Sequence, residues 1–136
     1  MKKSGSRPEY TLDVYPRYDE ATRERTTVFL VQTTRIFVSF RYEILLTSEV
    51  KPGEIHLDIL GLHAPSILMP ESGPARGIRE FAGLSGSYIL AVRKQDKSIN
   101  EFEIRFGKER IDVLRKPAKP FIDVSTHSDG VNPMAG

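Results

Sequence analysis

The sequence predicts an all-β fold, and three observations support this class. Apolar and polar residues alternate with a period of two in many short segments, as they do in half-buried strands. No segment of helical length shows an apolar stripe at the spacing of an α-helix. Turn residues recur about every eight to twelve residues, which is typical of sandwiches and barrels. We therefore expect one antiparallel β-sandwich of about eight or nine strands, with a small closed β-barrel as the alternative.

The first half of the chain contains two short strand patterns. Tyr10, Leu12 and Val14 alternate with polar residues, and Pro16 is expected to end that strand. The charged stretch 17–25 has no apolar stripe and is interpreted as a loop, and residues 27–32 form a β-branched run. A turn is expected near Thr33 and Thr34.

The longest strand is predicted over residues 36–46, where one face carries Val38, Phe40, Tyr42, Ile44 and Leu46. Pro52-Gly53 is a strong turn signal, and a further strand is expected at 55–59. Residues 61–77 contain three prolines and three glycines and are interpreted as an irregular connection. A short strand is expected at 78–81.

The stretch 84–115 has the clearest pattern of the chain and predicts consecutive antiparallel strands. Their inward residues are expected to be Tyr88, Leu90, Val92, Phe102, Ile104, Phe106, Ile111 and Val113. Phe121, Ile122 and Val124 predict one more edge strand after two prolines. The domain is therefore expected at 9–124, between a flexible start (1–8) and a flexible polar tail (125–136).

Leu84-x-Gly86-x-Tyr88-x-Leu90-x-Val92 resembles the tyrosine-corner stretch of immunoglobulin-like and fibronectin type III-like sandwiches. The resemblance implies an immunoglobulin-like layout in which the Tyr88 hydroxyl bonds back to the preceding corner. It implies no particular function, because such sandwiches have very many roles.

Composition narrows the classes of function. The 136 residues fit one domain, and 39% hydrophobic with 28% charged residues is ordinary for a globular protein. The absence of cysteine excludes disulfides, thiolate zinc sites and a cysteine nucleophile. We expect no cofactor, no membrane span, and, since no signal peptide is evident, a cytoplasmic location by default.

Two groups of residues could bind ions. His56 and Asp58 share one strand face, with His63 seven residues later, but the solvent-face interpretation is favoured over a metal site. Arg76 and Arg79, in a glycine-containing segment, are candidates for an anionic ligand, but an exposed loop that connects two strands is the favoured interpretation.

Residues of the hydrolase-triad types occur near the C-terminus, at Ser125, His127, Ser128 and Asp129. Five consecutive residues of a tail cannot hold three catalytic groups on separate rigid elements. We therefore expect no enzymatic activity.

Residues 76–119 carry 11 basic and 6 acidic side chains, which makes nucleic-acid binding through the basic region 93–119 an alternative function. Two features oppose it: Phe102 and Phe106 are expected to face the core rather than a nucleic acid, and acidic residues dilute the same strands.

Apolar residues on presumed outer faces favour an interaction surface. They are Phe37, Leu45, Ile89, Ala91 and Leu114. The function predicted first is a non-enzymatic protein-interaction or accessory module that binds another protein, or a second copy, through a sheet face or an edge. A small-ligand or carbohydrate-binding domain is the first alternative.

Overall fold

The computed structural model describes residues 8–37, 42–64, 73–108 and 110–126, and within them the chain forms nine strands and no helix. The strands are β1 (Tyr10–Asp19), β2 (Glu24–Phe37), β3 (Glu43–Lys51), β4 (Glu54–His63), β5 (Gly73–Ala82), β6 (Gly86–Arg93), β7 (Ile99–Phe106), β8 (Ile111–Arg115) and β9 (Ile122–Thr126). The all-β class is confirmed.

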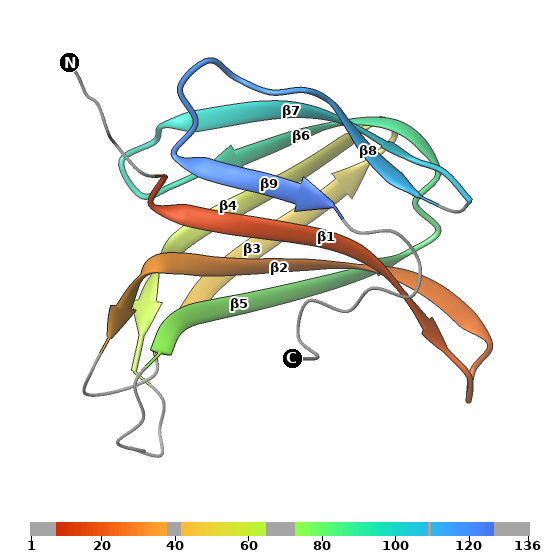
Figure 1. The fold of residues 1–136 in the computed structure, drawn as a ribbon, viewed down its shortest axis with the longest axis horizontal. Coiled ribbons are helices and arrows are strands. Elements are labelled where there is room, and N and C mark those ends of the chain that lie inside the picture. The colour runs from red at the N-terminus through yellow and green to blue at the C-terminus, as the bar shows by residue number, and fades with distance from the viewer. Residues whose placement is uncertain (1–7, 38–41, 65–72, 109, 127–136) are drawn as a thin grey trace.

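All nine strands belong to one sheet, in the order β8-β7-β6-β4-β3-β5-β2-β1-β9. This sheet curls into a nearly closed barrel (Figure 1), because its two outermost strands, β8 and β9, come to lie against each other. The described strands thus match the barrel alternative and do not form the two packed sheets of the predicted sandwich. The sheet is also mixed, because β1/β9, β4/β6 and β3/β5 are parallel pairs.

One apolar cluster fills the barrel, because alternate residues of every strand point inward. Its largest fully buried members include Phe29, Phe102, Leu12, Ile55, Leu57, Leu90 and Ile104. The antiparallel pairing predicted within 84–115 is confirmed, since β6 pairs with β7 and β7 pairs with β8. Tyr88 is half-buried, and its ring packs edge-on against Phe106 at 5.5 Å between centroids.

The predicted end of the first strand is wrong, because β1 continues through Pro16 to Asp19 and forms a hairpin with β2. Pro16 lies opposite Thr27, beyond Val14, where the pairing of β1 with β9 ends. A strand position with a neighbour on one side only tolerates the missing N–H of proline.

The turn expected at Thr33 and Thr34 is wrong as well, because β2 continues to Phe37 through a bulge in its pairing with β5. The Thr33 hydroxyl accepts a hydrogen bond from the Ala75 N–H (2.9 Å) and donates one to the Arg35 carbonyl (2.8 Å). These two bonds satisfy backbone groups that the bulge removes from the ladder.

The predicted strand 36–46 is not one strand. Ile36 and Phe37 end β2, residues 38–41 lie outside the described part, and β3 begins at Glu43. Alternation continues across both strands, so the pattern did not reveal where one strand ends. The turn at Pro52-Gly53 is confirmed and joins β3 to β4, with Gly53 at φ +74°.

The irregular connection predicted at 61–77 is shorter than expected, because β5 begins at Gly73 and continues to Ala82. The strand expected at 78–81 is therefore the second half of β5. Gly77 allows β5 and β3 to approach closely, since a Cβ there would lie 2.8 Å from the Ile44 carbonyl oxygen.

The edge strand predicted around 121–124 is confirmed as β9, which lies parallel to β1. Ser125 and Thr126 belong to β9, and the Ser125 hydroxyl donates a 2.7 Å hydrogen bond to the Asp13 carboxylate. His127, Ser128 and Asp129 lie outside the described residues.

Candidate functional site

The outer apolar residues predicted as an interface do not gather into one patch. Ile89 lies between Glu54 of β4 and Glu103 of β7, so charged side chains flank it on both sides. Leu114 is half exposed on the edge strand β8, at an irregular position in its ladder with β7. Each of these residues is an isolated apolar position, which by itself indicates no interface.

Ala91 and Phe37 do not form an apolar patch either, although Ala91 lies two residues from Ile89 on the same face of β6. Ala91 has His56 and Glu101 as its cross-strand neighbours. Phe37 packs on the core, where its ring contacts Tyr42 at 4.9 Å and Arg35 lies over its other side. Phe37 therefore contributes to the barrel interior rather than to an outer surface.

Leu45 belongs to a different group of exposed apolar residues that crosses four neighbouring strands. We call Leu60 of β4, Leu45 of β3, Pro74 of β5 and Ile36 of β2 the terminal apolar row. Leu45 faces Gly61 next to Leu60, and Ile36 faces Pro74. The side chains of Ile36, Leu60 and Leu45 are 64%, 54% and 44% exposed.

A charged pair of positions divides the terminal apolar row in its middle. Glu43 of β3 and Arg76 of β5 are register partners in the parallel pair between these strands, so both side chains point outward. Arg76 is half-buried, and its buried Nε has no hydrogen-bond partner among the residues that the structure describes. Because β3 and β5 are parallel, Leu45 lies two residues beyond Glu43 toward one end of the strands, and Pro74 lies two residues before Arg76 toward the other end.

Arg76 and Arg79 are not brought together as an anion site. They are three residues apart on one strand, so their side chains leave opposite faces of β5. The Arg79 guanidinium donates to the carbonyls of Ile78 and Leu46, and it thereby bridges β5 to β3. Arg79 is a structural residue of the sheet.

The weak metal candidates each have another partner or stand apart. His56 Nε2 lies 3.0 Å from Glu54, and Asp58 forms an ion pair with Arg93 at 2.5 Å. His63 is at the far end of the same strand, roughly 20 Å from His56 by the rise of an extended chain. No group of three potential metal ligands occurs within the described ranges.

The basic region 93–119 has mixed charge on its outer face. Arg105 lies opposite Asp112 and Glu103 opposite Arg115, and Arg110 pairs with Asp112 at 3.2 Å. Phe102 and Phe106 are buried in the barrel, as the alternation predicted. This face therefore offers neither a uniform basic surface nor exposed rings for stacking.

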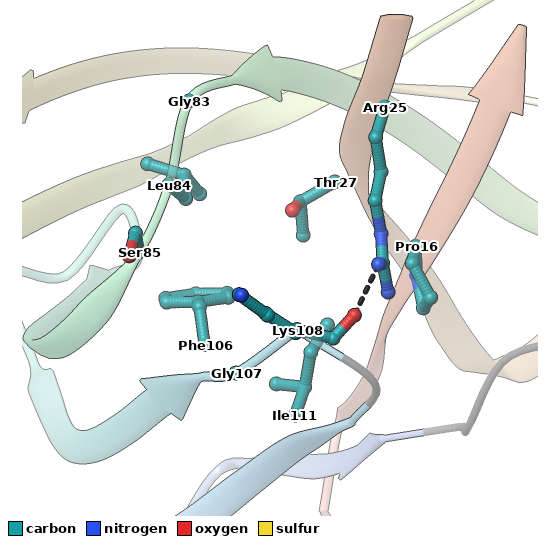
Figure 2. A pocket seen from close by; sticks show the side chains of 10 residues that line it. All are labelled: Pro16, Arg25, Thr27, Gly83, Leu84, Ser85, Phe106, Gly107, Lys108 and Ile111. Atoms are coloured by element: carbon teal, nitrogen blue, oxygen red, sulfur yellow. Dashed lines mark hydrogen bonds between the residues drawn. The ribbon is translucent and has the colours of Figure 1, made fainter.

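A cleft of about 230 Å³ lies at one end of the barrel, which we call the open end (Figure 2). Its walls come from both strand ends and connections: Pro16, Arg25, Thr27, Gly83, Leu84, Ser85, Phe106, Gly107, Lys108 and Ile111. Gly83 has φ +78°, a left-handed conformation that lets the β5–β6 connection turn around the cleft.

Two cations lie at this cleft. Arg25 on β2 donates from Nη1 to the Lys108 carbonyl oxygen, which joins β2 to the β7–β8 turn. Figure 2 shows the Lys108 side chain directed back into the cleft, beside the Phe106 ring. Tyr18, 59% exposed, is the register partner of Arg25 just beyond the cleft. Positive charge thus lies over an apolar wall.

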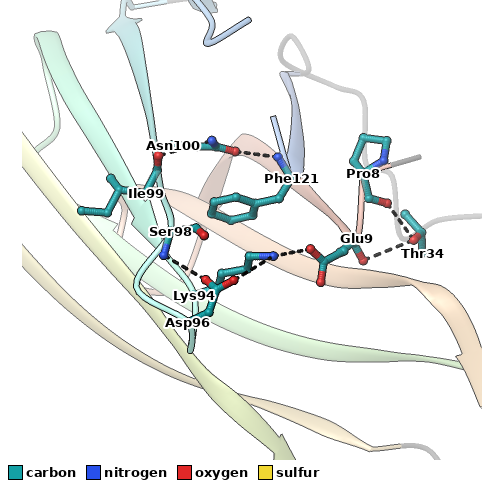
Figure 3. A network of polar contacts seen from close by, with 9 residues as sticks. All are labelled: Pro8, Glu9, Thr34, Lys94, Asp96, Ser98, Ile99, Asn100 and Phe121. Atoms are coloured by element: carbon teal, nitrogen blue, oxygen red, sulfur yellow. Dashed lines mark hydrogen bonds and ion pairs between the residues drawn. The ribbon is translucent and has the colours of Figure 1, made fainter. Parts of the chain in front are cut away.

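The other end of the barrel, the closed end, is held by a polar network (Figure 3). The Lys94 ammonium contacts the Glu9 carboxylate, lies 3.8 Å from Asp96 and 5.0 Å from the centre of the Phe121 ring. The Phe121 N–H donates to the buried Asn100 side-chain oxygen at 2.8 Å. The network therefore ties β1, the β6–β7 turn and the start of β9 together.

Three groups at the closed end have shifted pKa values. A hydrogen bond to the Glu9 carboxylate raises the pKa of Lys94, and burial raises the pKa of Tyr10. Hydrogen bonds from Ser98 lower the pKa of Asp96. These shifts follow from ordinary desolvation and charge pairing within a structural network.

The sequence did not single out the cleft. Arg25 was assigned to a loop, and Lys108 was one of nine basic residues in the 93–119 region. They are 83 residues apart, so only closure of the barrel brings them together. Three glycines in the sequence could have indicated this end of the barrel. They are Gly83, Gly86 and Gly107, and they mark sharp connections at one end of the sheet.

Comparisons with protein-family models, curated protein sequences and solved structures each gave no match. Among the described residues there is also no helix long and apolar enough to cross a membrane. The function is therefore inferred from the surfaces of the barrel.

Proposed function

We propose that this chain is a non-enzymatic interaction module that associates with a second copy of itself through the terminal apolar row. The carrying observation is the exposure of Leu45 and Leu60 on the neighbouring strands β3 and β4, and of Ile36 on β2, which β5 separates from β3. Neighbouring exposed apolar side chains favour an interface, whereas scattered ones do not.

The charges within the row favour a second copy over an unrelated partner. Glu43 and Arg76 lie side by side in the middle, with apolar residues outside each of them. A two-fold axis parallel to β3 and β5 at this point places Glu43 of one copy against Arg76 of the other, and Leu45 against Ile78, which is 48% exposed.

The absence of catalytic activity is part of this proposal. It is supported by the described titratable groups, whose contacts are ion pairs and hydrogen bonds within the barrel wall. The immunoglobulin-like relationship implied by residues 84–92 stays a prediction, to be tested by comparison with relatives of this chain.

Sedimentation equilibrium tests the dimer directly. We expect a concentration-dependent monomer–dimer equilibrium, and we expect Leu60→Asp to weaken it at least about tenfold, because the substitution buries a charge in an apolar contact. Leu114→Asp is the matched control, since Leu114 is about as exposed (50%) on an edge strand outside the row. A monomer at all concentrations would exclude the proposal.

Charge exchange separates the two-fold arrangement from other modes of association. Glu43→Arg and Arg76→Glu should each dimerise poorly alone, because each brings like charges together. When mixed, the two variants should form a heterodimer, because the opposite charges then face each other. A wild-type dimer whose affinity neither variant changes would instead point to another surface.

A further inference from the structure

The cleft at the open end has a rigid apolar wall. Phe106 and Ile111 are buried members of the core, and the Phe106 ring contacts Phe29 at 6.3 Å and Tyr88 at 5.5 Å. Leu84 packs on the same cluster from the β5–β6 connection. A wall held by the barrel core is preformed, so a ligand would not have to order it.

The polar groups of the cleft carry positive charge or hydroxyls. Lys108 and Arg25 supply the cations, Thr27 and Ser85 supply hydroxyls, and none of the described residues that line the cleft carries a carboxylate. The hydrogen bond from Arg25 to the Lys108 carbonyl fixes the backbone from which the Lys108 side chain enters the cleft (Figure 2). Within the described part of the chain, the Lys108 ammonium has no ion-pair partner.

The size of the cleft limits what it can hold. A cavity of about 150 Å³ accommodates benzene, so about 230 Å³ leaves room for one ring, or a short chain, and one small polar group. An apolar body against Leu84 and Phe106 would bring that polar group to Lys108. An anionic group fits this position, because it pairs with the ammonium and accepts hydrogen bonds from the hydroxyls.

We propose that this cleft binds a small monocarboxylate with a compact apolar body, with the carboxylate at Lys108 and the apolar body against Phe106 and Leu84. The site is independent of the dimer, because the terminal apolar row lies at the opposite ends of β2, β3 and β4. Self-association through the row leaves the cleft open.

The test is a titration of the full chain with benzoate, followed by backbone amide NMR. We expect saturable shifts at Leu84, Ser85, Gly107 and Lys108, with a Kd of about 0.1–1 mM for a ligand of this size. Benzyl alcohol has the same ring and no charge, and it should bind at least about fivefold more weakly.

Variants identify the residue that recognises the charge. Lys108→Gln should weaken benzoate binding about tenfold and leave benzyl alcohol binding unchanged, whereas Lys108→Arg should retain benzoate binding. Lys116→Gln is the matched control, an exposed lysine beyond β8 and outside the cleft, and it should change nothing.

Three results would overturn the proposal. They are equal binding of benzoate and benzyl alcohol, unchanged benzoate binding by Lys108→Gln, and the absence of saturable shifts up to about 20 mM benzoate. A dimer that persists in any of these cases leaves the proposed self-association standing, so the two proposals fail separately.

Discussion

The two ends of the barrel each place a lysine beside a phenylalanine ring, but the two lysines have different surroundings. At the closed end, Lys94 lies over the Phe121 ring and is surrounded by the Glu9 and Asp96 carboxylates, and its side chain is only 16% exposed. At the open end, Lys108 lies beside the Phe106 ring in a cleft whose described lining residues include no carboxylate. At the closed end, the carboxylates pair with the lysine, so the lysine stabilises the fold. At the open end, the lysine has no such partner among the described residues and is available to an anionic ligand.

The chain segments that meet at each end explain this difference. The Lys94–Glu9 contact joins residues 85 apart and fastens the start of β1 to the β6–β7 turn. Asn100 and Phe121 add the start of β9, which has β1 as its paired neighbour. The closed end therefore fastens strands next to the seam between β8 and β9 through several polar groups, whereas the open end has the hydrogen bond from Arg25 to the Lys108 carbonyl across this seam.

The largest effect is expected at Asn100, which is 7% exposed and accepts the Phe121 N–H. Asn100→Ala should lower the free energy of unfolding by about 2–3 kcal/mol, because it leaves a buried amide without an acceptor and removes packed atoms. Urea unfolding measures the change.

Thr27→Val is the comparison at the open end. Thr27 is also buried and lines the cleft, but removal of its hydroxyl should cost less than about 1 kcal/mol. Equal losses in the two variants would mean that the ends do not differ in their contribution to stability.

Lys94→Met should have an intermediate effect, a loss of about 1 kcal/mol near neutral pH, because the ion pair and the cation–π contact are both lost. Lys108→Met at the open end should change the unfolding free energy by less than about 0.5 kcal/mol. Chemical denaturation of both variants measures this contrast.

Lys94→Met also tests the pH dependence of the free energy of unfolding. The pKa of Lys94 is raised in the folded state, so its stabilisation is complete below the unfolded value of 10.5 and is lost as the pH rises through the folded value. The raised pKa of Tyr10 acts in the same direction, because the folded state disfavours the phenolate. Wild-type stability should thus fall above about pH 10, and less steeply in Lys94→Met. Identical alkaline profiles would contradict the Lys94 contribution.

The alternation of residues predicted the parts of the fold that depend on local geometry. Residues 84–115 formed the expected hairpins because each strand pairs with the next strand in the sequence through a marked turn. The prediction failed where the sheet departs from regular pairing. The bulge after Gln32 resembles a turn in sequence, and Pro16 resembles a strand end. Both features depend on neighbouring strands that come from distant parts of the sequence.

The candidate surfaces could not be predicted for the same reason. If the segment that contains Arg76 and Arg79 were a loop, the two side chains could lie together. In a strand they lie on opposite faces, because they are three residues apart. The terminal apolar row combines β4, β3, β5 and β2, and the order of these strands includes a parallel neighbour that no hairpin rule predicts. The periodicity of a sequence shows which face of a strand a side chain lies on. Which residues of different strands lie together on the surface depends on the strand order, which the periodicity does not show.

The smallest effect is expected at Asp96, an exposed residue in the β6–β7 turn of the closed end. Its carboxylate accepts the Ser98 N–H at 2.9 Å, and hydrogen bonds from Ser98 lower its pKa from 3.8. A lowered folded-state pKa gives stability that is present above pH 3.8 and is lost as the pH falls through the folded value. Asp96→Asn keeps an acceptor oxygen but does not ionise, so its melting temperature should fall less on acidification than that of the wild type. Thermal melts between pH 5 and pH 2 measure the difference, because this interval covers about one unit above and two units below the ordinary pKa of an aspartate. Acid profiles that superimpose would show that Asp96 does not contribute to the network at this end.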